Sequence, residues 1–84
     1  MTDAEILEVI SRAIREETDN PDIVVGPATT AADVPGWDSL AHGRIMLAIE
    51  IELGARCNIE DTYAAANVGD LVPLFRAALR QGER

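Results

Sequence analysis

The sequence has 84 residues, of which nearly half are apolar, and a formal net charge of −8 at pH 7. A chain of this length forms one small domain, so we expect a single unit over residues 1–84. The acidity argues against nucleic-acid binding, which depends on neutralising phosphates with basic side chains, and favours partner proteins with basic surfaces.

Cys57 is the only cysteine of the sequence, which excludes an intramolecular disulfide and a multi-cysteine metal site. No apolar run approaches the roughly 18 residues that cross a bilayer, and the N-terminus lacks a basic segment followed by an apolar one. We therefore expect a cytoplasmic monomer that uses neither a membrane nor a metal ion.

A helix is predicted near the N-terminus from a capping pattern at its first turn. Thr2-Asp3-Ala4-Glu5 has the pattern of a capping box, in which Thr2 and Glu5 each bind a backbone N–H of the first turn. Apolar residues then recur every three or four positions, and the helix is expected to end near Glu17 because a proline follows soon after. Glu8 and Arg12 stand four apart in the favourable order for a surface ion pair.

Residues 18–37 show no sustained periodicity and predict a long loop. Ile23, Val24 and Val25 are apolar enough to hold this loop against the helices, and Pro35-Gly36 marks its last turn.

A long helix is predicted after that turn. Asp38 or Ser39 can cap it, and Trp37 is placed to pack just before it as a hydrophobic staple. Gly54 suits a left-handed C-cap. The expected apolar stripe is formed by Leu40, Ile45, Ile49 and Leu53. A serine hydroxyl is therefore expected at the positive end of a helix, where a covalently attached phosphate is stabilised.

Two further helices are expected. Asn58 caps a short one that runs to about Ala65. The last helix begins after Asn67 and is kinked between residues 69 and 73, or begins with Asp70 as its cap, because Pro73 does not fit a regular helix interior.

The stretch around Ser39 resembles the acyl carrier protein family. The resemblance lies in Asp38-Ser39-Leu40, preceded by Gly36-Trp37 and followed by a helix that ends Glu50-Ile51-Glu52-Leu53-Gly54. It extends over the whole chain, including its length, the first helix, the long loop and Val68-Gly69-Asp70-Leu71. It implies an all-α four-helix bundle of three longer helices and one short one, with a long loop between the first and second.

The resemblance also implies a function. In that family the serine of this triplet is modified with 4′-phosphopantetheine, derived from coenzyme A, whose thiol carries acyl groups as thioesters. Ser39 is then the attachment residue, and Asp38 helps to present it to a phosphopantetheinyl transferase. The other implied partners are enzymes that load, transfer or condense acyl groups. The protein itself is then no enzyme, and a cavity beside its central helix shelters short acyl chains.

The central helix departs from the pattern of fatty-acid carriers. Its partner-facing positions hold fewer acids, and by the resemblance they are Leu40, Gly43, Arg44, Leu47 and Glu50. This favours dedicated partners in a specialised pathway that makes a polyketide, a hybrid peptide or a tetronate-like product. The alternative functions are a carrier for primary fatty-acid synthesis and a peptidyl carrier. The alternative explanation of the departures themselves is that they are neutral changes of the surface.

Two other classes of function are alternatives to a carrier protein. One is an unmodified acidic helical adaptor that binds partner proteins through the same surface. The other is a hydrolase built on Asp38, Ser39 and His42, which lacks the Gly-x-Ser-x-Gly elbow and has no evident oxyanion site. We expect His42 to be solvated or partner-facing and Cys57 to be a small, partly buried residue.

Overall fold

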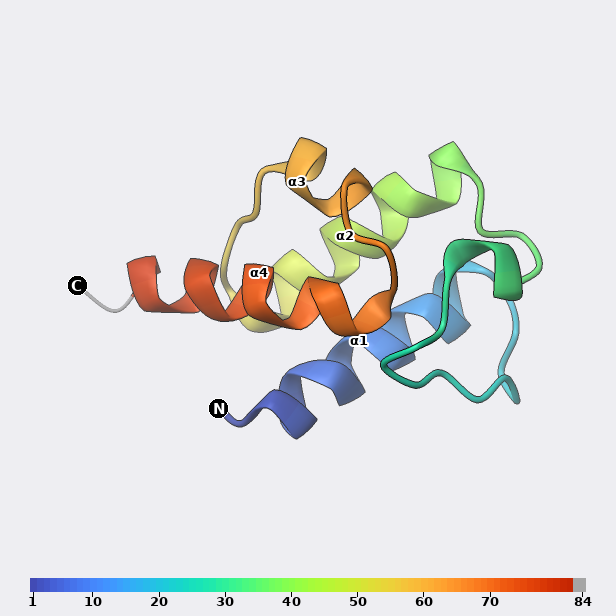
Figure 1. Cartoon of the computed structure of the whole chain (residues 1–84), viewed down its shortest axis with the longest axis horizontal. Coiled ribbons are helices and arrows are strands. Elements are labelled where there is room, and N and C mark those ends of the chain that lie inside the picture. The colour runs from blue at the N-terminus through green and yellow to red at the C-terminus, as the bar shows by residue number, and fades with distance from the viewer. Residues whose placement is uncertain (83–84) are drawn as a thin grey trace.

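The computed structural model describes residues 1–82, so the last two residues of the predicted domain lie outside the described part of the chain. It contains four α-helices, α1 (Asp3–Glu17), α2 (Ser39–Leu53), α3 (Ile59–Tyr63) and α4 (Val68–Gly82), and a 3₁₀ turn at Ala31–Asp33. The predicted all-α fold of three longer helices and one short one is confirmed (Figure 1). No helix within residues 1–82 is long and apolar enough to cross a membrane.

Helix α1 begins at the predicted capping box. The backbone N–H of Glu5 donates to Thr2 Oγ1 at 3.1 Å, and the N–H of Thr2 donates to Glu5 Oε1 at 2.8 Å. These bonds hold the pKa of Glu5 below its usual value of 4.5. The predicted Glu8–Arg12 ion pair is wrong, since Arg12 Nη1 instead lies 2.8 Å from Glu52 Oε1 on α2 and so joins two helices.

The core forms where α1 packs against both α2 and α4. Full burial of one large aliphatic or aromatic side chain stabilises the fold by about 1.5–3 kcal/mol. The largest fully buried side chains are Ile6, Ile10 and Ile14 of α1, Ile45 and Ile49 of α2, and Val68, Leu71 and Phe75 of α4. The predicted stripe of α2 is wrong at its first member, because Leu40 is 77% exposed and the buried face begins at Ala41.

The loop between α1 and α2 forms one end of the molecule, at the right in Figure 1. Val25 and Val34 are buried and anchor it, as predicted for Val25, whereas Val24 is 88% exposed and contributes nothing to this anchor. The amide of Asn20 also donates to the carbonyl of Pro35 at 2.7 Å, which joins the two ends of the loop.

The same loop caps α4. The N–H groups of Val68 and Gly69 donate to the carbonyls of Thr29 and Pro27 at 2.8 and 2.7 Å. Asn67 Oδ1 accepts from the N–H of Asp70 at 3.0 Å, so the helix begins at Val68 and the alternative start at Asp70 is wrong. Helix α4 continues through Pro73 to Gly82. Separately, the loop supplies acceptors for two first-turn N–H groups that have no partner within the helix.

Helix α2 ends as predicted at Gly54, whose φ of 67° is the left-handed conformation that glycine adopts without strain. Asn58 caps α3, with Oδ1 accepting from the N–H of Glu60 at 3.0 Å. This helix ends at Tyr63, earlier than the predicted end near Ala65.

Candidate functional site

Ser39 is the first residue of α2 and is exposed to solvent. Asp38 is the N-cap, and its Oδ1 accepts from the N–H of Ala41 at 2.8 Å. Of the two possible caps, the structure therefore selects Asp38 and leaves the Ser39 side chain uninvolved in capping. Within residues 1–82 the Ser39 hydroxyl has no hydrogen-bond partner, so it stands open to reaction.

The backbone around Ser39 suits an attached phosphate. The N–H groups of Ser39 and Leu40 belong to the first turn, and within the described residues neither is bonded to a protein acceptor. The first turn of α2 also holds no acidic residue. Unpaired N–H groups and the helix dipole together stabilise an anion at this position, so a phosphodiester on Ser39 fits the site.

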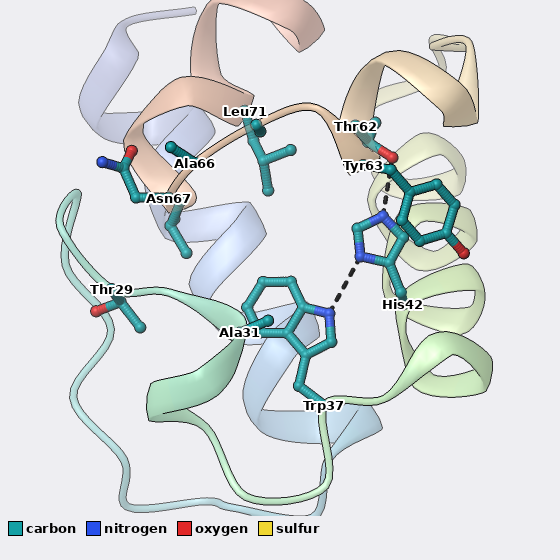
Figure 2. Close-up of a pocket in the computed structure, with 11 residues that line it drawn as sticks. Thr29, Ala31, Trp37, His42, Thr62, Tyr63, Ala66, Asn67 and Leu71 are labelled. Atoms are coloured by element: carbon teal, nitrogen blue, oxygen red, sulfur yellow. Dashed lines mark hydrogen bonds between the residues drawn. The ribbon is translucent and has the colours of Figure 1, made fainter.

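Three side chains, from the end of the loop, from α2 and from α3, form a hydrogen-bonded chain (Figure 2). Trp37 Nε1 lies 3.1 Å from His42 Nδ1, and His42 Nε2 lies 2.9 Å from Thr62 Oγ1. Because an indole N–H can only donate, His42 Nδ1 must accept, and the proton of the neutral ring is then on Nε2 and is donated to Thr62. Thr62 in turn donates to the carbonyl of Ile59 at 2.6 Å.

The environment of His42 contradicts the prediction that it is solvated or partner-facing. The residue is only 7% exposed, and its ring stacks on Tyr63 with centroids 4.2 Å apart. Burial lowers the pKa of His42 below its ordinary value of 6.5, because it disfavours the charged ring. His42 is therefore a neutral structural link between α2, α3 and the loop.

The same bonds argue against a hydrolase. Both ring nitrogens of His42 are engaged, with Trp37 and Thr62, so neither is available to Ser39 as a general base. The Asp38 carboxylate, for its part, caps α2. The three residues are close in sequence but do not form a triad.

A small cavity of about 120 Å³ lies against this hydrogen-bonded chain. Trp37, His42 and Thr62 line it on one side, and residues of the loop and of the segment before α4 line the other (Figure 2). Its remaining walls are mainly apolar and are formed by Ala31, Ala65, Ala66, Val68 and Leu71.

The predicted partner-facing residues differ in exposure. Leu40 and Leu47 are exposed, and so is Arg44, whose Nε lies 3.6 Å from Glu17 Oε1. Gly43 is half-buried. Glu50 is half-buried as well, and its Oε2 accepts from the N–H of Cys57 at 2.9 Å, so this carboxylate holds the turn after α2.

Cys57 is partly buried, as predicted. Burial, together with the nearby charges of Glu50 and Asp61, raises the pKa of its thiol to about 11. The thiol is therefore protonated at neutral pH and is a poor nucleophile.

Sequence reasoning placed Trp37 before the helix but missed its partners. Trp37 precedes the N-cap, and His42 is the fourth residue of α2, which are the two positions that meet in a staple. That spacing could have indicated the contact. Nothing local to residues 37–42 indicates Thr62, which comes from α3.

Comparison with known proteins gives one informative match. No protein-family model matches the chain, and no curated protein matches its sequence. The solution NMR structure of the holo acyl carrier protein from Geobacter metallireducens is similar in structure, with a TM-score of 0.78 and 28% sequence identity over 90% of this chain and 87% of that one. With Asp38-Ser39-Leu40 at the start of α2, this match confirms the resemblance: the chain has the fold of the acyl carrier protein family, and it is a carrier-like protein rather than an enzyme.

Proposed function

We propose that the chain carries 4′-phosphopantetheine on Ser39 and presents acyl groups bound to that arm to other enzymes. The observation that carries the proposal is the exposed Ser39 hydroxyl at the capped N-terminus of α2, within an acyl carrier fold. The similar structure from Geobacter metallireducens is described as a holo protein.

The residues around Ser39 have distinct roles in this proposal. The N–H groups of Ser39 and Leu40 stabilise the phosphate, and Asp38 fixes the start of the helix that displays the hydroxyl. The arm, when bound, supplies a thiol that holds an acyl group as a thioester. Tethering of this kind raises the effective concentration of the acyl group at a partner's active site.

The proposed partners are a phosphopantetheinyl transferase and acyl-processing enzymes that dock on α2. Beyond Ser39, the exposed side chains of this helix are Leu40, Arg44, Leu47, Ile51 and Glu52, and Glu52 is paired with Arg12 of α1. Glu50 is partly withdrawn from this surface by its bond to Cys57. A less acidic docking face supports dedicated partners in a specialised polyketide, hybrid-peptide or tetronate-like pathway over the basic surfaces of general fatty-acid synthesis.

Mass spectrometry of the intact protein tests the modification. The protein is incubated with coenzyme A, magnesium and a promiscuous phosphopantetheinyl transferase, and we expect a mass gain equal to one phosphopantetheine. Ser39→Ala is expected to abolish the gain.

The chain offers a matched control, because Ser11 is its other serine. Ser11 is buried and its hydroxyl donates to the carbonyl of Leu7 at 2.8 Å, so Ser11→Ala should leave the mass gain unchanged. A folded protein that gains no mass contradicts the proposal and favours an unmodified adaptor that binds partners through Leu40 and Leu47.

A further inference from the structure

Ser39 belongs to an exposed segment, residues 35–40, that has few anchors. Five of these six residues are exposed, and Trp37 alone is partly buried, packed against the core. The amide of Asn20 holds the first residue of the segment, through the carbonyl of Pro35. Because the Ser39 side chain has no partner within the described residues, the backbone alone sets the position of its hydroxyl, and Trp37 is the side chain that anchors this backbone.

His42 holds both residues that directly precede Ser39. Its Nδ1 accepts from the indole N–H of Trp37 at 3.1 Å, and its backbone N–H donates to the carbonyl of Asp38 at 2.8 Å. The ring is itself held from α3, where Thr62 Oγ1 lies 2.9 Å from Nε2 (Figure 2). A buried side chain of α2 therefore fixes the exposed segment that leads into the same helix.

The two bonds made by His42 differ in what they require. The backbone bond is the first hydrogen bond of the helix and does not depend on the side chain. The bond to Trp37 needs an acceptor at the position of Nδ1, since an indole N–H only donates. Without that acceptor a partly buried N–H is left unpaired, which favours movement of Trp37 toward water and loosens the segment.

Loading of Ser39 depends on where its hydroxyl lies. In the proposed modification, Ser39 Oγ forms a bond to the phosphorus of coenzyme A that carries the pantetheine. The bond from that phosphorus to the bridging oxygen of the pyrophosphate breaks, adenosine bisphosphate leaves with the electron pair, and the hydroxyl proton passes to a basic group of the transferase. A displacement of about 1 Å in a reacting group can lower such a rate about 100-fold.

We propose that His42 is a positioning residue for the modification of Ser39, acting through its hydrogen bond to Trp37. This inference rests on the proposed attachment of phosphopantetheine to Ser39. His42 does not touch the hydroxyl or take its proton; it keeps the backbone before Ser39 in the arrangement that the transferase needs.

The test is a kinetic comparison of two variants that have the same shape. Asn carries an acceptor oxygen on Cγ where His carries Nδ1, whereas Leu carries a methyl group there. Initial rates of loading with coenzyme A, magnesium and the transferase are measured by intact mass over a range of apo-protein concentrations. We expect kcat about tenfold lower in His42→Leu with little change in KM, because the exposed side chains of α2 are unaltered. His42→Asn should keep most of the native kcat.

Trp37→Phe tests the other partner of the bond. It keeps an aromatic ring and removes the N–H donor, so it should lower kcat as His42→Leu does. Both substitutions remove the same interaction, so the double variant should load no more slowly than the slower single variant.

A control separates positioning from stability. Ile6 is the fourth residue of α1 and is fully buried, and the N-terminal end of that helix lies away from the loop (Figure 1). Ile6→Val should lower the melting temperature by creating a small cavity, and yet should load with the native kcat.

The outcomes separate this inference from the proposed function. No mass gain in the native protein contradicts attachment to Ser39, and the inference fails with it. Normal loading of the native protein overturns the inference alone if folded His42→Leu or Trp37→Phe keeps the native kcat, or if Asn and Leu at position 42 lower kcat equally. A His42→Asn protein that does not fold also overturns it, because His42 would then be a requirement of the whole fold.

Discussion

The neutral ring of His42 accepts a hydrogen bond from Trp37 at Nδ1 and donates one to Thr62 from Nε2. Protonation adds a hydrogen to Nδ1, which then faces the indole N–H with donor against donor. The ring is also buried, so the charged form loses hydration. Geometry and burial thus act in the same direction, and both favour the neutral ring in the folded protein.

This predicts a specific dependence of stability on pH. Since the pKa of His42 is lowered on folding, the unfolded chain binds the proton more tightly, and folding stability is fully present above pH 6.5 and falls as the pH drops through and below that value. Urea unfolding at a series of pH values should show this loss.

The control is His42→Gln, which removes the titrating ring and should flatten the curve between neutral pH and the range where carboxylates titrate. Glu5 and Asp33 also have lowered pKa values, but their ordinary values of 4.5 and 3.8 place their contribution at lower pH. A native curve that is flat through pH 6.5 would contradict this account of His42.

The buried thiol of Cys57 gives a second prediction about a single residue. With its thiol pKa raised to about 11, alkylation by iodoacetamide at pH 8 should be more than tenfold slower than that of an exposed cysteine of ordinary pKa. In Glu50→Gln the thiolate loses a repelling charge, so alkylation should become faster. Asp61→Asn should act in the same direction and more weakly, because its charge is the smaller cause. Equal rates in the native protein and Glu50→Gln would exclude the proposed role of Glu50.

Between elements, the decisive contact is the approach of the loop to the start of α4. A Cβ atom added at Gly69 would lie 2.9 Å from the carbonyl oxygen of Pro27, a backbone atom that also accepts the Gly69 N–H. Glycine at this position therefore lets the loop bind the first turn of α4, whose N–H groups have no partner within the helix.

Two glycine-to-alanine substitutions distinguish the effect of this contact on stability from the general effect of replacing glycine by alanine within a helix. Gly69→Ala should destabilise the protein by about 1–3 kcal/mol, because the loop must move and its two hydrogen bonds weaken. Gly43→Ala, in the interior of α2 with no atom within 4 Å of the new methyl group, should instead stabilise it by about 0.5–1 kcal/mol. Both values come from urea unfolding. Stabilisation by both substitutions would show that the contact with the loop does not matter.

Signals local to one stretch of sequence predicted the elements well. The capping box at Thr2, the cap at Asn58 and the glycine C-cap at Gly54 each depend on residues within a few positions, and all three are confirmed. Long-range contacts were not predictable in this way. The bonds from the N–H groups of Val68 and Gly69 to carbonyls of the loop, for example, join segments about 40 residues apart, and no signal near α4 indicates them.

The same distinction applies to the site. The position of Ser39 at the start of a capped helix follows from its neighbours in sequence. The burial of His42 does not, because its partner Thr62 and the ring of Tyr63 come from another helix. Leu40 was assigned to the apolar stripe from its spacing alone, yet it is the second residue of α2 and is exposed, and the buried face of the helix begins at Ala41.

At the scale of the whole molecule, the excess of negative charge works against the compact state. Self-repulsion from a net charge of −8 is weakened by salt. Salt also weakens the ion pairs between elements, which join Arg12 to Glu52, Arg44 to Glu17 and Arg76 to Asp3. Those pairs are at least partly exposed, and exposed pairs contribute only about 0–1 kcal/mol each.

We therefore expect relief of repulsion to outweigh the loss of these pairs, so that added sodium chloride raises the melting temperature. A gain of about 1 kcal/mol corresponds to a rise of roughly 4–8 °C in a domain of this size. Within residues 1–82 no cluster of three or more acidic, histidine or cysteine side chains is placed to hold a metal ion. Magnesium chloride at the same ionic strength should consequently give the same rise as sodium chloride in scanning calorimetry. A larger rise with magnesium would mean that the ion binds a site, and a fall with either salt would mean that the ion pairs outweigh the repulsion.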